Sequence, residues 1–409
     1  MTADRWATES RARAFQADLD AKPEALARLA VELPRDSVIP TLPLAPRRIV
    51  LLGMGSSGYV AGIAAGRLRA AGLDAVSELA SAAVGTPAAR DTLVLAISAT
   101  GGSIETLAAV ERHRGRSRVV AVTNTPASPL AQVCDAVIEL HAGPEVSGVA
   151  CRTFQHTLLT LRAIEAQLTG LRLDVAELCS RVAAATADLF ALRPAWLPEV
   201  AAALDGRDGV HALAPAERLS SALQSALMVR EGPRRPGTGS ETGEWAHVDV
   251  YLARTLDYRA LLYAGSRWDA QAMEWLTLRG STVVAVGGDV PGAAVALRYA
   301  GDDDPDVAVA TETLMAELGR GTLVGRSRGT VARWTADVLR TSNSLCGPRR
   351  HLPSPPPRRH AAMSERPCHL PGDHGARPGL RAVTAHGRMP LTASQRGAVA
   401  PLPAVDPSP

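Results

Sequence analysis

Short apolar runs alternate with amphipathic stretches between residues 45 and 170. Continuous apolar runs are typical of strands buried in a parallel sheet, whereas apolar positions three or four apart indicate helices. The pattern predicts strands at Arg48–Leu52, Thr92–Ile97, Arg118–Val122 and Ala136–Leu140. It predicts helices at Tyr59–Ala71, from Ser103 to about Arg112, and at Gly148–Leu168. This alternation of strands and helices predicts a doubly wound α/β domain.

A weaker copy of the pattern follows after residue 205. Strands are expected near Val210–Leu213, Ala260–Tyr263 and Ser281–Val286, and helices near Glu217–Arg230, Arg267–Leu278 and Asp306–Leu318. We therefore expect a helical lead-in at 1–44, a first α/β domain at 45–170, a helical connector at 171–204, a second α/β domain at 205–325 and a tail at 326–409.

The tail differs from the rest of the chain in composition. After Cys346 it holds 13 of the 29 prolines and five of the ten histidines, and it shows no apolar periodicity. From Arg320 onward there are 14 arginines against four acidic residues, a balance of 14 − 4 = +10 within a net charge of +3. Such a segment buries too little apolar surface to fold, so we expect disorder. A shifted reading frame and a functional basic arm are the alternative interpretations.

The bulk composition is that of a folded protein, with 46% hydrophobic and 21% charged residues. The N-terminus lacks the apolar stretch of a signal peptide, and no apolar window approaches 18 residues. We therefore expect a cytoplasmic protein that binds neither membranes nor nucleic acid. The five cysteines form no C-x-x-C pair, which favours free thiols and predicts no metal site.

Two loops rich in glycine and hydroxyl residues follow predicted strands and open helices. Open α/β sheets bind ligands at this edge, where backbone N–H groups and the helix dipole favour an anion. The expected phosphate ligands are Ser56, Ser57, Ser98, Thr100 and Ser103. The spacing Gly53-x-Gly55-x-x-Gly58, with Asp74 downstream, also fits a dinucleotide site. A third interpretation is that these hydroxyls only cap two helices.

The sequence resembles the sugar isomerase (SIS) domains, in particular the isomerase half of glutamine–fructose-6-phosphate aminotransferases. The resemblance covers about residues 8 to 320, and it is carried by Gly53–Gly58, Ser77-Glu78 after the next strand, Ala96–Leu107, Val122–Asn124 and Ala142–Ala150. It implies two tandem SIS domains, each a parallel sheet sandwiched by helices in a flavodoxin-like arrangement. It also implies that Ser57, Ser98, Thr100 and Ser103 hold a sugar phosphate. Further substrate contacts are expected at Gly55, Ala99, Gly101, Val149 and Ala150.

The second half contains a candidate acid–base pair. The resemblance implies that Glu231 shuttles a proton between C1 and C2 of the sugar and that His247, sixteen residues later, assists ring opening. Three departures limit the likeness. The chain begins Met1-Thr2, so no glutaminase activity is expected; Lys22 is the only lysine, so no Schiff base forms at the family's usual place; and Val248-Asp249 replaces the family's Gly-Pro after the histidine.

Three functional hypotheses follow. The favoured one is an enzyme acting on an amino- or keto-hexose phosphate by isomerisation, deamination or cleavage of an amino-acid adduct. The resemblance implies a homodimer in which His247 serves the neighbouring subunit, and no cofactor is expected. The alternatives are a sugar-phosphate sensor without turnover and an NAD-dependent oxidoreductase.

Overall fold

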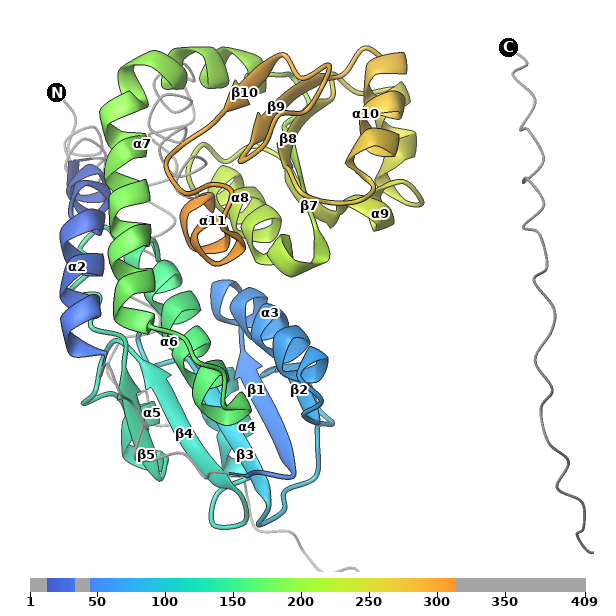
Figure 1. Cartoon of the computed structure of the whole chain (residues 1–409). Helices are drawn as coiled ribbons and strands as arrows, with labels where there is room; N and C mark the ends of the chain where they lie inside the picture. The colour runs from blue at the N-terminus through green and yellow to red at the C-terminus, as the bar shows by residue number, and fades with distance from the viewer. Residues whose placement is uncertain (1–12, 34–44, 314–409) are drawn as a thin grey trace, which may run out of the picture. The chain divides into compact units, whose positions relative to one another are not determined.

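Two parallel five-stranded sheets organise the chain in the computed structural model, which describes residues 13–33 and 45–313 (Figure 1). The described residues all belong to one compact unit of the chain. The predicted tail at 326–409, the end of the second domain and the first part of the lead-in lie outside the described residues. Within the described ranges, no helix is both long enough and apolar enough to cross a bilayer.

The first sheet has the strand order β2-β1-β3-β4-β5, and all neighbouring strands pair in parallel. Its strands are β1 (Arg48–Gly53), β2 (Ala75–Leu79), β3 (Thr92–Ile97), β4 (Arg118–Thr123) and β5 (Ala136–Glu139). Its helices are α3 (Ser56–Ala70), α4 (Ile104–Glu111), α5 (Pro129–Val133) and α6 (Arg152–Thr169). The apolar runs explain the buried central strands, because every residue of β3 is buried.

The second sheet has the order β10-β9-β8-β6-β7, which repeats the topology of the first sheet when its strands are counted from β6. Its strands are β6 (Val210–Ala214), β7 (Gly237–Glu241), β8 (Arg259–Tyr263), β9 (Thr282–Val286) and β10 (Val295–Leu297). Its helical segments are η1 (Ala216–Arg218), α8 (Leu219–Glu231), α9 (Thr242–Trp245), η2 (Asp249–Arg254), α10 (Asp269–Leu278) and α11 (Pro305–Thr311). The two sheets flanked by helices confirm the predicted tandem α/β fold.

Some element boundaries differ from the sequence prediction. Ser77 and Glu78, expected after a strand, lie within β2. The helix expected from Gly148 begins at Arg152, because residues 148–151 form its approach loop. The predicted helix Asp306–Leu318 begins at Pro305 as α11, and its second half lies outside the described residues.

A long helix, α7 (Val175–Leu204), connects the two sheets and contains Pro194 and Pro198. It packs on α2 (Lys22–Glu32), on α11 and on β9. One apolar cluster runs from α2 through α7 to the strands of the second sheet. The N-terminal lead-in, the connector and the second sheet thus share a core.

Lys22, the only lysine of the sequence, lies at the start of α2 and is fully buried. Its Nζ donates to the carbonyl oxygen of Cys151 and to Gln155 Oε1, both at 2.9 Å. Gln155 Nε2 in turn donates to the carbonyl oxygen of Ala310 at 2.6 Å. A buried ammonium group requires such acceptors, and here they join α2, α6 and α11.

Candidate functional site

The candidate site lies at the carboxyl ends of β1 and β3, where the strand order of the first sheet reverses. The chain leaves β1 toward β2 on one side, whereas β3 lies on the other. Such a switch point is where open α/β sheets bind ligands. The loops Gly53–Gly58 and Ser98–Ser103 both start there, at the ends of β1 and β3.

Glycine shapes the first loop. A Cβ on Gly53 would lie 2.7 Å from the carbonyl carbon of Ser57, so only glycine lets the first turn of α3 pack against the end of β1. Gly55 precedes α3 with a positive φ of 50° and is exposed, a conformation that other residues rarely adopt. The first turn of α3 therefore starts at the sheet edge, where the backbone N–H groups of Ser57 and Gly58 donate to the carbonyl oxygen of Met54.

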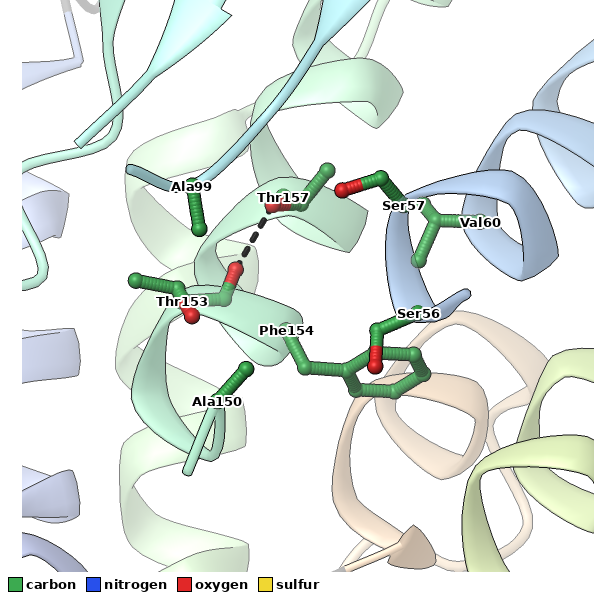
Figure 2. Close-up of a pocket in the computed structure, with 8 residues that line it drawn as sticks. All are labelled: Ser56, Ser57, Val60, Ala99, Ala150, Thr153, Phe154 and Thr157. Carbon is green, nitrogen blue, oxygen red and sulfur yellow. Dashed lines mark hydrogen bonds between the residues drawn. The ribbon is translucent and has the colours of Figure 1, made fainter. Parts of the chain in front are cut away.

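A cavity of about 20 Å³ opens between this turn and the start of α6 (Figure 2). That volume is roughly the space that one buried water molecule requires. Ser56, Ser57 and Val60 lie on the α3 side, with Ala99 across from them. The remaining walls come from the start of α6 and are formed by Ala150, Thr153, Phe154 and Thr157.

The hydroxyl groups of the predicted site and of the cavity differ in their hydrogen bonds. Ser57 Oγ and Ser98 Oγ donate to no residue that the structure describes, and Ser98 is buried. Thr157 Oγ1 donates to the carbonyl oxygen of Thr153 at 2.6 Å (Figure 2). Ser56 Oγ donates to Gln224 Oε1 at 2.7 Å, which ties α3 to α8. Ser57 is therefore the cavity-lining serine whose hydroxyl proton is unused.

The second loop is held by its own side chains. Ser103 Oγ caps α4 by accepting a hydrogen bond from Thr106 N at 3.3 Å, and it donates to Glu105 at 2.8 Å. Thr100 Oγ1 accepts from Gly102 N at 3.4 Å. Gly101 has a φ of 62°. Ser103 thus performs the capping role that one interpretation of the sequence assigned to these hydroxyls.

The structure brings some of the predicted residues together and leaves others apart. Four of them line the cavity: Ser56, Ser57, Ala99 and Ala150. Val149, which precedes Ala150 in the sequence, is buried. Glu231, the last residue of α8, and the exposed His247 do not line it. Thr153 and Thr157 do line it but were not predicted, because hydroxyls within an amphipathic helix give no local signal of ligand binding.

The matching edge of the second sheet is filled by the chain itself. Arg218 Nη1 donates to the carbonyl oxygen of Ala264 at 2.9 Å and to the fully buried Glu312 at 2.7 Å. Burial raises the pKa of Glu312 to about 8, against the opposing effect of Arg218. Asp269 Oδ2 accepts from the backbone N–H groups of Gly265 and Ser266. These carboxylates occupy donors that an anionic ligand would need.

Comparison with known proteins agrees with this geometry. Residues 45–166 match the SIS domain family. Glutamine–fructose-6-phosphate aminotransferase (isomerizing) of Pyrobaculum aerophilum is 32% identical over 245 residues, which cover 56% of this chain and 40% of that enzyme. The chain therefore spans well under two thirds of this relative.

Solved structures share the fold across both domains. The C-terminal domain of glucosamine-fructose-6-phosphate aminotransferase from Francisella tularensis superposes with a TM-score of 0.66 at 15% identity, covering 76% of this chain and 96% of that one. Tagatose-6-phosphate ketose/aldose isomerase from Escherichia coli gives a TM-score of 0.63 at 16% identity, covering 77% and 94%. Residues 45–166 of this chain are thus similar to the SIS domains, and the second sheet repeats the strand order of the first.

Proposed function

We propose that the first domain binds the phosphate of a sugar phosphate at the β1–β3 edge. The observation that carries the proposal is the Ser57 hydroxyl, which faces the cavity at the first turn of α3 and donates to no described residue. A phosphate oxygen accepts hydrogen bonds and favours a helix N-terminus. One oxygen fits the cavity of about 20 Å³, and the rest of the group lies over the Ser98–Ser103 loop.

We further propose that the protein is an enzyme acting on an amino- or keto-hexose phosphate by isomerisation, deamination or cleavage of an amino-acid adduct. Glu231 is the proposed base that moves a proton between C1 and C2, and His247 the acid that assists ring opening. Two of the relatives named above support this class of substrate, since the names of the Pyrobaculum aerophilum and Escherichia coli enzymes specify a hexose phosphate. α8 supports it as well, because Gln224 of this helix accepts a hydrogen bond from the cavity-lining Ser56 and the helix ends at Glu231.

The proposed assembly is a homodimer in which His247 reaches the site of the neighbouring subunit. His247 is exposed and is followed by Val248 and Tyr251, whose exposed fractions are 55% and 68%. Apolar side chains exposed together favour a protein contact. A lysine Schiff base is not part of the mechanism, because the single lysine is buried against α6.

Calorimetric titration of the full chain with fructose 6-phosphate, glucosamine 6-phosphate, inorganic phosphate and NAD tests the binding. Ser57→Ala removes a hydrogen bond to a charged group, about 1.5 to 3 kcal/mol, and should weaken sugar-phosphate binding roughly tenfold or more. Ser81→Ala, an exposed serine after β2, is the matched control. Binding of NAD alone, or equal affinity of the Ser57 and Ser81 variants, would contradict the proposed phosphate site.

Turnover is tested separately. Glu231→Gln should retain sugar-phosphate binding and abolish conversion of the sugar that binds best. The conversion is measured by exchange in D₂O of the proton that moves between C1 and C2, which lies on C1 of a ketose and on C2 of an aldose. Binding without conversion or proton exchange in the wild type would identify a sensor.

A further inference from the structure

The hydrogen bond between Ser56 and Gln224 connects the cavity to the second domain. The two residues are 168 positions apart in sequence, and their oxygen atoms lie 2.7 Å apart. Ser56 opens α3 and lines the cavity, while Gln224 lies on α8 and is fully buried. The two helices pack on each other (Figure 1).

The Ser56 hydroxyl has a single proton, which sets a limit on what it can bind. In the structure that proton is donated to Gln224 Oε1. A phosphate oxygen accepts hydrogen bonds, so it would need the same proton. Ser56 therefore cannot donate to a phosphate while it donates to Gln224.

Gln224 carries a second group that resolves this competition. Its Nε2 is buried and has no hydrogen-bond partner among the described residues. A buried N–H group without a partner is costly. If the amide turns end for end, Nε2 donates to Ser56 Oγ, and the serine proton becomes available to the ligand. An amide can make the bond in both directions, whereas a carboxylate can only accept.

We propose that Gln224 is a positioning residue that releases the Ser56 hydroxyl to an anionic ligand by reversing the direction of their hydrogen bond. The inference rests on the proposed sugar-phosphate site. Because Gln224 lies two turns before Glu231 on α8, the same bond links ligand binding to the helix that carries the proposed base.

Two substitutions at Gln224 separate this role from a structural one. Gln224→Glu keeps an acceptor for Ser56 and retains its proton, so binding of inorganic phosphate and fructose 6-phosphate should weaken about tenfold or more. Gln224→Met breaks the link but frees the hydroxyl, so affinity should stay within about threefold of wild type. If Gln224 only held α3 against α8, Gln224→Met would weaken binding more than Gln224→Glu, which keeps the hydrogen bond to Ser56. The titrations are run at pH 8.5, because burial raises the pKa of an introduced carboxyl.

A second background excludes simple charge repulsion. In Ser56→Ala there is no proton to retain, so adding Gln224→Glu should cost no further affinity. A further loss of tenfold in that background would show repulsion by the carboxylate and overturn the inference. So would equal affinities of wild type and Gln224→Glu. If the wild type binds neither phosphate compound, the proposed function itself fails and the inference falls with it. Thermal unfolding of each variant checks that it is folded.

Discussion

The carboxylate of Glu145 accepts a hydrogen bond from Thr153 Oγ1 at 2.6 Å across the first turn of α6. Its other oxygen accepts from the backbone N–H groups of Cys151 and Arg152, both at 2.6 Å. One acidic side chain therefore satisfies the donors at the N-terminus of α6. This helix end serves as a wall of the cavity, and its N–H groups are already bound.

Replacing Glu145 with alanine should destabilise the protein by about 1 to 2 kcal/mol, the cost of losing a helix cap. Urea unfolding measures the change. Glu111→Ala, whose side chain is 67% exposed beside Arg114, is the control and should change stability by less than about 0.5 kcal/mol. Equal effects of the two substitutions would show that the Glu145 contacts do not support α6.

Gly101 and Gly115 form a matched pair for testing the second loop. Both have positive φ, 62° and 70°, so alanine at either position strains the backbone by about 1 to 2 kcal/mol. A Cβ on Gly101 would also overlap the side chain of Ser128, whereas nothing lies within 4 Å of one on Gly115. Gly101→Ala should therefore cost about 2 kcal/mol more in urea unfolding. Similar losses in the two variants would mean that the loop adapts.

Asp18 and Arg152 form a buried ion pair, in which Asp18 Oδ1 lies 2.9 Å from Arg152 Nη2. The two side chains are 5% and 7% exposed. Asp18→Asn removes the negative charge and leaves Arg152 without its partner, which should cost about 3 kcal/mol. Adding Arg152→Met removes the stranded charge and should restore part of this loss. Chemical unfolding of the single and double variants measures both effects. A double variant that is less stable than Asp18→Asn would disagree with this account.

Glu165 should make stability depend on pH. Its Oε2 lies 3.1 Å from Arg162 Nη1 and 3.8 Å from Arg67 Nη1. The residue lines a cavity of about 300 Å³ at the C-terminal ends of α3 and α6. Burial raises its pKa from 4.5 to about 7, although both arginines oppose the shift. A carboxyl with a raised pKa stabilises the fold while it is protonated. This contribution is complete below about pH 4.5 and is lost as the pH rises to about 7.

Glu165→Gln stays uncharged and lacks this titration. Between pH 5 and 8 the free energy of unfolding of the wild type should therefore fall relative to the variant by about 2 to 3 kcal/mol. The quantity to compare is the difference in free energy of unfolding between the wild type and Glu165→Gln at each pH. Burial also lowers the pKa of His156 to about 4, so the stability of both proteins rises with pH between that value and 6.5, and the difference removes this contribution. A difference that stays constant across the range would refute the assignment.

The fold could be predicted where side chains alone decide it. β1, β3 and β4 are continuous apolar runs and form the centre of the first sheet. β7 could not be predicted, because its sequence Gly-Thr-Gly-Ser-Glu contains no large apolar residue. Its place is set by tertiary packing: a Cβ on Gly239 would lie 2.8 Å from the backbone of Ala222 in α8. Glycine is selected there for close approach.

The candidate site divides in the same way. Ser57 and Ala99 follow buried strands, so the loop pattern was sufficient to place them at the sheet edge. Thr153 and Thr157 are one helical turn apart on α6, where hydroxyls are also compatible with packing. The bond from Ser56 to Gln224 joins separate domains, and no local pattern indicates it.

The burial of Lys22 has a practical consequence for chemical labelling. In this sequence an amine-reactive reagent has two targets, the α-amino group and Lys22, and the second is 0% exposed in the fold. Acylation of Lys22 therefore requires α2 to separate from α6. The rate at which a reagent modifies this lysine, read by mass spectrometry, would therefore report the separation of α2 from α6, because no other lysine side chain of the sequence reacts.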